Sequence, residues 1–308
     1  MKIKRREFLQ KSMVGVGGLL VGARLAPAAE STATRCDPFQ TVPLGKTGIR
    51  MSRTCMGTGM RGGMRHSNQT RLGPEAFEAL LRGAYERGVR TFDLADLYGS
   101  HPYLIPALRS MPRQDFTIIT KIWWRPGGIP DQDRPDADVV VARFLKEIKT
   151  DYLDLVLLHC VETGDWPKTL SRQMEILDNL KHKGVIRAHG VSCHSIPALQ
   201  AAANEPWVDS VHARINPYGD SMDRPLDRNH DSVEEVVPVL RKIRAAGKGV
   251  VGMKIIGEGR YRNNDEKKDH SIHFALNSGC VDILNVGFEK TEEIDDFSAR
   301  VRKVPLPA

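Results

Sequence analysis

Short apolar segments alternate with longer, amphipathic segments along the chain from Thr54 onward. The apolar segments have the length of strands, and Leu153–His159 is hydrophobic almost throughout, as expected for a strand that is covered on both faces. The strands predicted in this way are Thr54–Gly57, Val89–Asp93, Phe116–Lys121, Leu153–His159, Ile186–Ser192, Ser210–Ile215, Gly249–Lys254 and Ile283–Val286.

Between these strands, apolar residues recur at spacings of three and four, which predicts helices with one buried face. The helices predicted in this way are Gly73–Arg87, Asp138–Lys149, Thr169–Lys183, Ser232–Ala246 and Glu292–Arg302. Gly184 and Gly247 follow two of them, as glycine often does at a helix C-terminus. The tract Arg260–Asp269 is rich in charge and lacks the helical spacing, so we expect a solvated loop over the barrel mouth.

Strands that alternate with helices indicate a parallel sheet. An open doubly wound sheet would need a Gly-x-Gly-x-x-Gly turn after its first strand, and Gly57–Gly59 does not complete one. We therefore predict an α/β fold, a (β/α)8 TIM barrel. An N-terminal β-hairpin over Thr41–Ser52, with its turn at Gly45–Gly48, is expected to close the barrel floor.

Residues 1–29 have the features of a targeting segment. Arg5 and Arg6 precede Phe8 and Leu9, and a weakly apolar run and small residues follow, which is typical of a twin-arginine signal peptide. The run Met13–Ala23 is too short to span a bilayer, so we expect no stable membrane anchor. The predicted organisation is a signal peptide over 1–29, a linker over 30–40 and the barrel over 41–308. The expected partner is the twin-arginine export machinery, and the expected location is the periplasm or another exported compartment.

Net charge and cysteine content exclude two classes of partner or cofactor. Most of the formal charge of +7 comes from residues 1–29, which carry six Lys or Arg and one Glu, so no nucleic-acid partner is indicated. The five cysteines are scattered without a Cys-x-x-Cys, and no metal cluster is predicted. His189 and His194 have odd spacing on a strand and should face opposite ways. Cys160 and Cys193 end neighbouring strands, and we expect both to be thiols.

Four titratable residues lie at the C-terminal ends of three predicted strands or in the loops after them, where such barrels carry their active sites. Asp93, Lys121 and His159 end the second, third and fourth strands, and Tyr98 follows Asp93 by five residues. An ammonium held by a carboxylate favours the phenolate form of a nearby tyrosine, which makes the phenol a better proton donor. An imidazole can then orient a carbonyl. These residues favour proton donation to a carbonyl that receives a hydride.

The segments around these residues resemble aldo-keto reductases, in order, over about residues 41–300. The matching segments are Leu44–Gly48, Gly88–Gly99, Thr120–Lys121, Thr150–His159 and Lys183–Ser192. The resemblance implies a catalytic tetrad in which Tyr98 is the general acid, Lys121 tunes it, Asp93 pairs with Lys121, and His159 positions the carbonyl.

The same resemblance implies a nicotinamide cofactor, NADP(H) with NAD(H) as the alternative. The residues implied to bind it are Ser192, Cys193, His212, Lys254 and Lys290. Three positions depart from the family pattern: Cys193 stands for Asn, His212 for Gln, and Ile215 for Tyr. Glu289, beside Lys290, disfavours a phosphate.

We therefore expect an exported oxidoreductase that acts on a small-molecule carbonyl or alcohol: an aldehyde, a ketone or a sugar-like substrate. Two alternatives stay open from the sequence. The first is a sensing barrel that binds the cofactor but turns over slowly or not at all, and the second is a lyase or isomerase without a cofactor.

Overall fold

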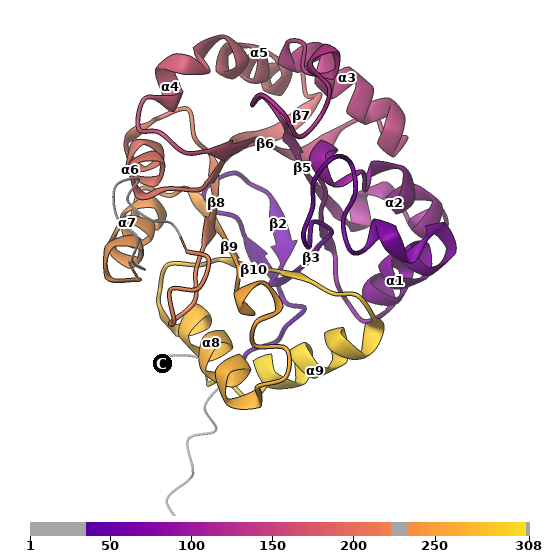
Figure 1. Cartoon of the computed structure of the whole chain (residues 1–308), viewed down its shortest axis with the longest axis vertical. Coiled ribbons are helices and arrows are strands. Elements are labelled where there is room, and N and C mark those ends of the chain that lie inside the picture. Colours follow the sequence, from indigo (N-terminus) through magenta and orange to yellow (C-terminus); the bar gives the residue numbers. More distant parts are fainter. Residues whose placement is uncertain (1–34, 223–232, 306–308) are drawn as a thin grey trace, which may run out of the picture. The chain divides into compact units, whose positions relative to one another are not determined.

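The structure is a computed structural model that describes residues 35–222 and 233–305. Eight parallel strands close into a barrel, and helices surround it (Figure 1). The barrel strands are β3 (Thr54–Gly57), β4 (Thr91–Asp93), β5 (Thr117–Ile122), β6 (Leu153–Val161), β7 (Ile186–Cys193), β8 (Ser210–Arg214), β9 (Gly249–Met253) and β10 (Ile283–Gly287). The predicted (β/α)8 fold is confirmed.

The helices of the described part lie on the outside of the barrel. They are α1 (Pro74–Glu86), α2 (His101–Leu108), α3 (Ala137–Ile148), α4 (Trp166–Thr169), α5 (Ser171–His182), α6 (Ile196–Asn204), α7 (Val233–Ala245), α8 (Asp265–Asn277) and α9 (Thr291–Val301). Short 3-10 turns include η2 (Asp96–Tyr98) and η5 (Gly257–Gly259), both in loops that follow strands. None of the described helices is long and apolar enough to cross a membrane.

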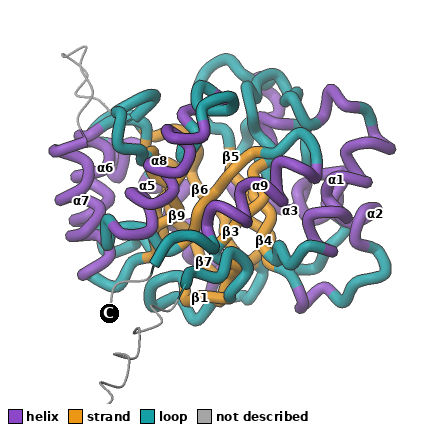
Figure 2. Tube along the Cα trace, turned by 90° about the horizontal axis from the view of Figure 1, so that it is seen from below, coloured by secondary structure: helices purple, strands orange, loops and turns teal. Residues whose placement is uncertain are grey.

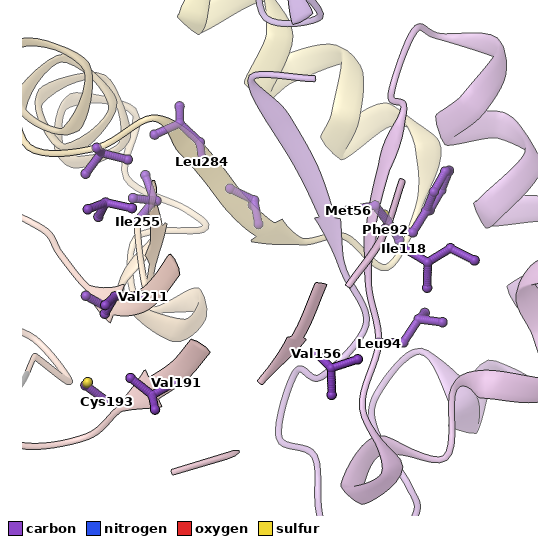
Figure 3. Close-up of a cluster of buried hydrophobic side chains, with 14 of the residues drawn as sticks. Met56, Phe92, Leu94, Ile118, Val156, Val191, Cys193, Val211, Ile255 and Leu284 are labelled. Carbon is purple, nitrogen blue, oxygen red and sulfur yellow. The ribbon is translucent and has the colours of Figure 1, made fainter. Parts of the chain in front are cut away.

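Alternation along the strands divides the core into two layers. Outward side chains such as Met56, Phe92 and Val191 pack against the helices in one large cluster (Figure 3). Inward side chains such as Ile119 and Leu155 form a smaller cluster inside the barrel. Because the strands are covered on both faces, they are apolar almost throughout, and polar groups inside the barrel stand out as exceptions.

The N-terminal hairpin closes one end of the barrel (Figure 2). Strands β1 (Thr41–Pro43) and β2 (Arg50–Ser52) pair antiparallel, and Leu44 lies fully buried in the inner cluster. The amide of Lys46 donates to the carbonyl oxygen of Gly247 at 2.8 Å, just before β9 begins. The hairpin therefore lies at the amino ends of the strands and leaves the opposite mouth open.

Two predicted boundaries need correction. Within the linker predicted over 30–40, residues 35–40 pack on the barrel: Cys36 is buried, and its amide donates to the carbonyl oxygen of Val304 at 3.1 Å. The loop predicted over Arg260–Asp269 becomes helix α8 from Asp265 onward. Asn264 caps that helix by accepting a hydrogen bond from the amide of Lys267. The signal peptide predicted over 1–29 lies outside the described residues.

Candidate active site

A buried ion pair lies at the centre of the barrel mouth. Lys121 is fully buried at the end of β5, and its ammonium donates to the carboxylate of Asp93, at the end of β4, and to the carbonyl oxygen of Leu94 at 3.1 Å. The side-chain amide of Asn285, on β10, donates to the other carboxylate oxygen of Asp93 at 2.6 Å. Burial alone would raise the pKa of Asp93, but Lys121 and then His212 outweigh it and hold that pKa well below its usual range.

Tyr98 lies above this pair. Its hydroxyl oxygen is 3.2 Å from Nε2 of His159, and the ammonium of Lys121 lies 4.9 Å from its ring centroid. Burial, followed by the charge of Asp93, raises the pKa of Tyr98 well above its usual value. The pKa of Tyr98 is therefore shifted in the opposite direction to the one expected from Lys121 alone, because burial makes the largest contribution and the carboxylate of Asp93 adds to it. Tyr98 remains a protonated phenol at neutral pH.

The loop after β3 fits around the tyrosine ring. A side chain at Gly59 would place its Cβ 2.3 Å from Cζ of Tyr98, so this position requires glycine. Thr58, next to it, donates from its hydroxyl to the backbone oxygen of Asp93 at 2.8 Å. The loop thus joins the end of β4 to the tyrosine five residues later and fixes the position of its ring.

His159 lies two residues before the end of β6 and contacts two tryptophans. The indole N–H of Trp124 donates to the backbone oxygen of His159 at 2.8 Å, and the ring of Trp123 meets the imidazole edge-on at 5.4 Å. Burial, together with Lys121, lowers the pKa of His159 well below its ordinary value. The imidazole is therefore neutral when it contacts the phenol.

The four predicted catalytic residues come together at the mouth, beside a chain of three cavities. The catalytic cavity, of about 100 Å³, is lined by Asp93, Tyr98 and Asn285 among others. The outer groove, of about 630 Å³, lies along the end of β10 and helices α8 and α9, and shares Met60 and Gly259 with the catalytic cavity. The side cavity, of about 380 Å³, shares Lys254 and Glu258 with the catalytic cavity.

Four of the five predicted cofactor residues lie in the barrel interior or line one of the cavities. Ser192 is buried with its hydroxyl oxygen 3.4 Å from Nε2 of His194, and the buried His212 has Nε2 3.6 Å from the carboxylate of Asp93. Lys254 lines the catalytic cavity and pairs with Glu258 at 2.7 Å. Exposed Lys290 lines the outer groove.

Cys193 is the predicted cofactor residue that the structure does not bring to the site. It packs in the outer hydrophobic layer together with Val191, as Figure 3 shows. Ile215, in the family's tyrosine position, also packs in this layer. The reason is alternation: outward positions on a strand take these residues, and the intervening Ser192 faces the interior.

Sequence reasoning missed several groups at the site, above all Asn285, Arg214 and Glu258. Asn285 interrupts the apolar strand β10, so its polarity alone was a detectable signal. Arg214 alternates with apolar neighbours on β8 and shares the inward face with His212, which was a second signal. Glu258 lies in the 3-10 turn η5 and gave no such pattern.

Asp96, three residues after Asp93, has a structural role. Its carboxylate accepts from Arg65 at 3.1 Å and pairs with Arg143 of α3, so it fastens the loop that carries Tyr98 to the helices outside. Asp93 therefore belongs to the reaction centre, whereas Asp96 holds the loop in place.

The two histidines considered as metal ligands lie in different surroundings. His189 stacks on Trp207 with ring centroids 4.1 Å apart, whereas His194 contacts the sulfur of Cys160 and the guanidinium of Arg214. In residues 35–222 and 233–305, no group of three or more His, Cys, Asp or Glu side chains is arranged to hold a metal ion.

Comparison with known proteins adds an independent finding. Residues 55–304 match the Aldo/keto reductase family. Methylglyoxal reductase DkgB of Salmonella typhimurium is 28% identical over 153 residues, which cover 48% of this chain and 55% of that protein. The chain thus spans about half the length of this relative.

Solved structures show the same fold. A putative aldo-keto reductase from Pseudomonas aeruginosa superposes with a TM-score of 0.67 at 22% identity, covering 89% of this chain and 98% of that one. An aldo/keto reductase from Klebsiella pneumoniae, in complex with NADP and acetate, has a TM-score of 0.64 at 18% identity, covering 86% and 90%. With the family match spanning most of its length, this chain belongs to the aldo/keto reductase family.

Proposed function

We propose that this chain is an exported oxidoreductase that transfers a hydride between NADP(H) and an aldehyde, ketone or sugar-like substrate. The observation that carries the proposal is the 3.2 Å contact between the Tyr98 hydroxyl and Nε2 of His159, directly above the buried pair of Asp93 and Lys121. A protonated phenol beside a neutral imidazole is suited to give a proton to a carbonyl oxygen.

The residues of the chain account for the proton transfer, and the cofactor accounts for the hydride transfer. When bound, the reduced nicotinamide supplies a hydride to the carbonyl carbon. As the carbonyl π bond breaks, Tyr98 donates its phenol proton to the oxygen, and His159 holds that oxygen in place. Lys121, paired with Asp93 inside the barrel, places its ammonium near the negative charge that develops. The reverse reaction uses the same groups as proton acceptors.

The cavities fit an extended dinucleotide. A ligand whose reactive ring lies at Tyr98 can continue past Gly259 into the outer groove, because the two cavities share lining residues. The buried side-chain oxygen of Asn285, which lines the catalytic cavity, has no hydrogen-bond partner among residues 35–222 and 233–305. Lys254 near the reactive end and Lys290 at the far end would hold the cofactor's phosphates.

Steady-state assays of the mature protein test this function. We expect NADPH or NADH to be oxidised when aldehydes, ketones or aldoses are added. The oxidation is measured as a loss of the absorbance of the reduced nicotinamide. Mass spectrometry of copurified small molecules is the second measurement. A bound dinucleotide without turnover would favour a sensing role, and no affinity for either dinucleotide would favour a cofactor-free lyase or isomerase.

Export by the twin-arginine pathway is supported by the sequence of residues 1–29 alone. Since we do not expect a free nicotinamide pool outside the cytoplasm, the folded barrel would carry its dinucleotide with it. Retention requires a dissociation constant below micromolar, or binding stronger than about −8 kcal/mol. The enzyme would then regenerate its cofactor by oxidising one substrate and reducing another. Free exchange of cofactor at high micromolar affinity would contradict this part of the proposal.

A conservative substitution tests the export route. Replacing Arg5 and Arg6 with lysines keeps the charge, yet precursor should accumulate in the cytoplasm because the transporter recognises the arginine pair. Cell fractionation and immunoblotting measure the distribution. Replacing Lys2 and Lys4 with arginines is the matched control and should leave export unchanged. Normal export of the double-lysine variant would rule out this pathway.

A further inference from the structure

The segment Gly59–Arg65, which we term the flap, follows β3 and packs its backbone against the catalytic tyrosine. Gly59 lies nearest to Cζ of Tyr98, and a side chain at Gly62 would place its Cβ 2.5 Å from Cδ1 of the same ring. Gly59 and Met60 also line the catalytic cavity. The flap is therefore a wall of the reaction centre, and its position limits how far the phenol can tilt.

The backbone of the flap is strained at three positions that carry side chains. Arg61, Met64 and Arg65 have φ values of 49°, 51° and 58°, in the left-handed region that residues other than glycine seldom occupy. In this region Cβ crowds a backbone carbonyl oxygen, so each of these residues costs conformational energy. Met64 is 66% exposed and gains little from packing. The flap therefore needs contacts elsewhere to hold this shape.

Such contacts converge on Arg65, the last residue of the flap. Its Nε donates to the carboxylate of Asp96 at 3.1 Å, and its Nη1 donates to the carboxylate of Asp133 at 2.9 Å. Its amide donates to the carbonyl oxygen of Leu97 at 3.0 Å, one residue before Tyr98. Arg65 thus ties the flap to the turn that carries the tyrosine and, through Asp133, to the loop between β5 and α3.

A second partner of Asp96 makes the role of Arg65 separable from the stability of the barrel. The buried carboxylate of Asp96 also pairs with Arg143 of α3, and this pair remains when Arg65 is replaced. The side chain of Arg65 is 36% exposed, so a neutral residue fits in its place. Loss of the guanidinium should therefore free the flap without leaving a buried charge unpaired.

We propose that Arg65 is a positioning residue for carbonyl reduction, which holds the flap against Tyr98 and so keeps the phenol directed at His159 and the substrate oxygen. Arg65 does not touch the reacting atoms and acts through the flap and the turn. With the flap in place, the phenol keeps its 3.2 Å contact with the imidazole, and the covered face of its ring stays away from water. This inference rests on the proposed reductase function.

Steady-state kinetics of Arg65→Gln with DL-glyceraldehyde test the catalytic consequence. We expect kcat to fall about 10- to 100-fold, the effect of misplacing a reacting group, whereas KM for the aldehyde should change little. Arg65→Lys keeps a charged donor but not the planar fork, so it should recover part of the lost kcat. A rise in KM with unchanged kcat would instead make Arg65 a binding residue and would overturn the proposal.

Hydrogen exchange and hydroxyl-radical labelling, both measured by mass spectrometry, test the flap without relying on turnover. In Arg65→Gln the amides of residues 59–66 should exchange about 10- to 100-fold faster, the shift that corresponds to losing hydrogen bonds to charged groups. Oxidative labelling of Tyr98 should increase. Asp133→Asn removes one of the two ion pairs and should have a smaller effect. Added to Arg65→Gln it should change little more, because both act through the same contact.

Arg61 supplies the matched control. It lies on the same flap, is exposed and is also left-handed, so Arg61→Gln makes the same chemical change and should keep wild-type kcat, exchange and labelling. If exchange and labelling respond to Arg65→Gln but the wild-type protein reduces no carbonyl, the flap contact stands and the reductase function falls. If the protein is a reductase and Arg65→Gln keeps its kcat, or lowers it with exchange and labelling unchanged, the positioning role is overturned.

Discussion

Charged side chains form a buried, fixed pair at the reaction centre, whereas in the outer groove they form partly exposed pairs that share partners. At the centre, Asp93 and Lys121 are buried, and strands on both sides fix their pairing. In the outer groove, four cations and four carboxylates share a partly exposed surface, where Arg262 contacts both Glu289 at 3.1 Å and Glu293 at 3.3 Å. Removing one partner of a buried pair leaves the other charge unpaired and unsolvated, which costs much free energy. Surface pairs rearrange and cost little free energy, because water solvates their charges. Substitutions should therefore have large effects at the centre and small, graded effects in the groove.

The largest effect is expected at the proton donor. Tyr98→Phe removes only the hydroxyl, so carbonyl reduction should fall by at least about a thousandfold, within the range for losing a general acid. Folding and nucleotide binding should be nearly unchanged, because the ring that packs against Gly59 remains. Steady-state kinetics and fluorescence titration with nucleotide measure the two properties.

Tyr103 provides the control for this substitution. It lies on α2, and its ring packs on Phe77 with centroids 5.0 Å apart, outside the barrel. Tyr103→Phe should keep normal turnover. Comparable turnover in Tyr98→Phe would show that another group supplies the proton.

The next largest effect concerns the buried pair. Lys121→Met leaves the carboxylate of Asp93 without its ammonium partner and should lower the free energy of unfolding by about 3–5 kcal/mol at neutral pH. In the native chain the lowered pKa of Asp93 contributes stability that is fully present above its unfolded pKa and is lost progressively as the pH falls through its folded pKa. In the variant, burial raises that pKa instead. The deficit should therefore be smallest at acidic pH and grow as the pH rises. Denaturant titrations at several pH values measure it.

The double variant Asp93→Asn with Lys121→Met tests the cause. With both charges removed, no carboxylate stays buried and unpaired, so part of the lost stability should return and the pH dependence should flatten. Equal deficits in the single and double variants at every pH would mean that lost packing of the lysine chain, and not charge, explains the effect.

The difference between the two regions also explains what the sequence could predict. Asp93, Lys121 and His159 end successive strands, and parallel strands bring such ends to one rim whatever the details of packing. The convergence of these three side chains therefore followed from strand order, whereas Tyr98 lies in the loop after β4 and its role was implied by the resemblance. The direction of the pKa shift of Tyr98 did not follow from strand order, because it depends first on how deeply the phenol is buried and then on the charge of Asp93.

Features that depend on neighbours distant in the sequence were harder to predict. Helix α8 lacks a strong apolar face at its charged start, and what identifies it is the cap at Asn264 and burial of Ile272 further along. Helix α2 begins next to Pro102 and contains Pro106, which obscures the helical pattern. Cys193 was assigned to the site because the resemblance indicates a position in the sequence but not the face of the strand on which its side chain lies.

The smallest effect is expected in the outer groove, where Glu289 bears on the choice between NADP and NAD. Its carboxylate pairs with Arg262 at 3.1 Å and accepts from the amide of Asn68 at 2.7 Å. Glu289→Gln removes one negative charge from the groove and leaves Arg262 with Glu293 as its remaining carboxylate partner in the groove. The affinity for NADP(H) relative to NAD(H) should rise about three- to tenfold, the size expected for one screened charge near a phosphate.

Fluorescence titrations with both nucleotides at low and high salt measure this change, which should shrink as salt is added because the groove is open to solvent. Glu175→Gln, on the exposed surface of α5, alters the net charge equally and should leave the ratio of affinities unchanged. If Glu289→Gln shifts neither affinity, the adenosine ribose and its 2′ substituent do not lie beside this carboxylate. If it instead weakens NAD(H) binding alone, Glu289 binds the ribose hydroxyls directly, and its carboxylate selects NAD by attraction and not by repelling a phosphate.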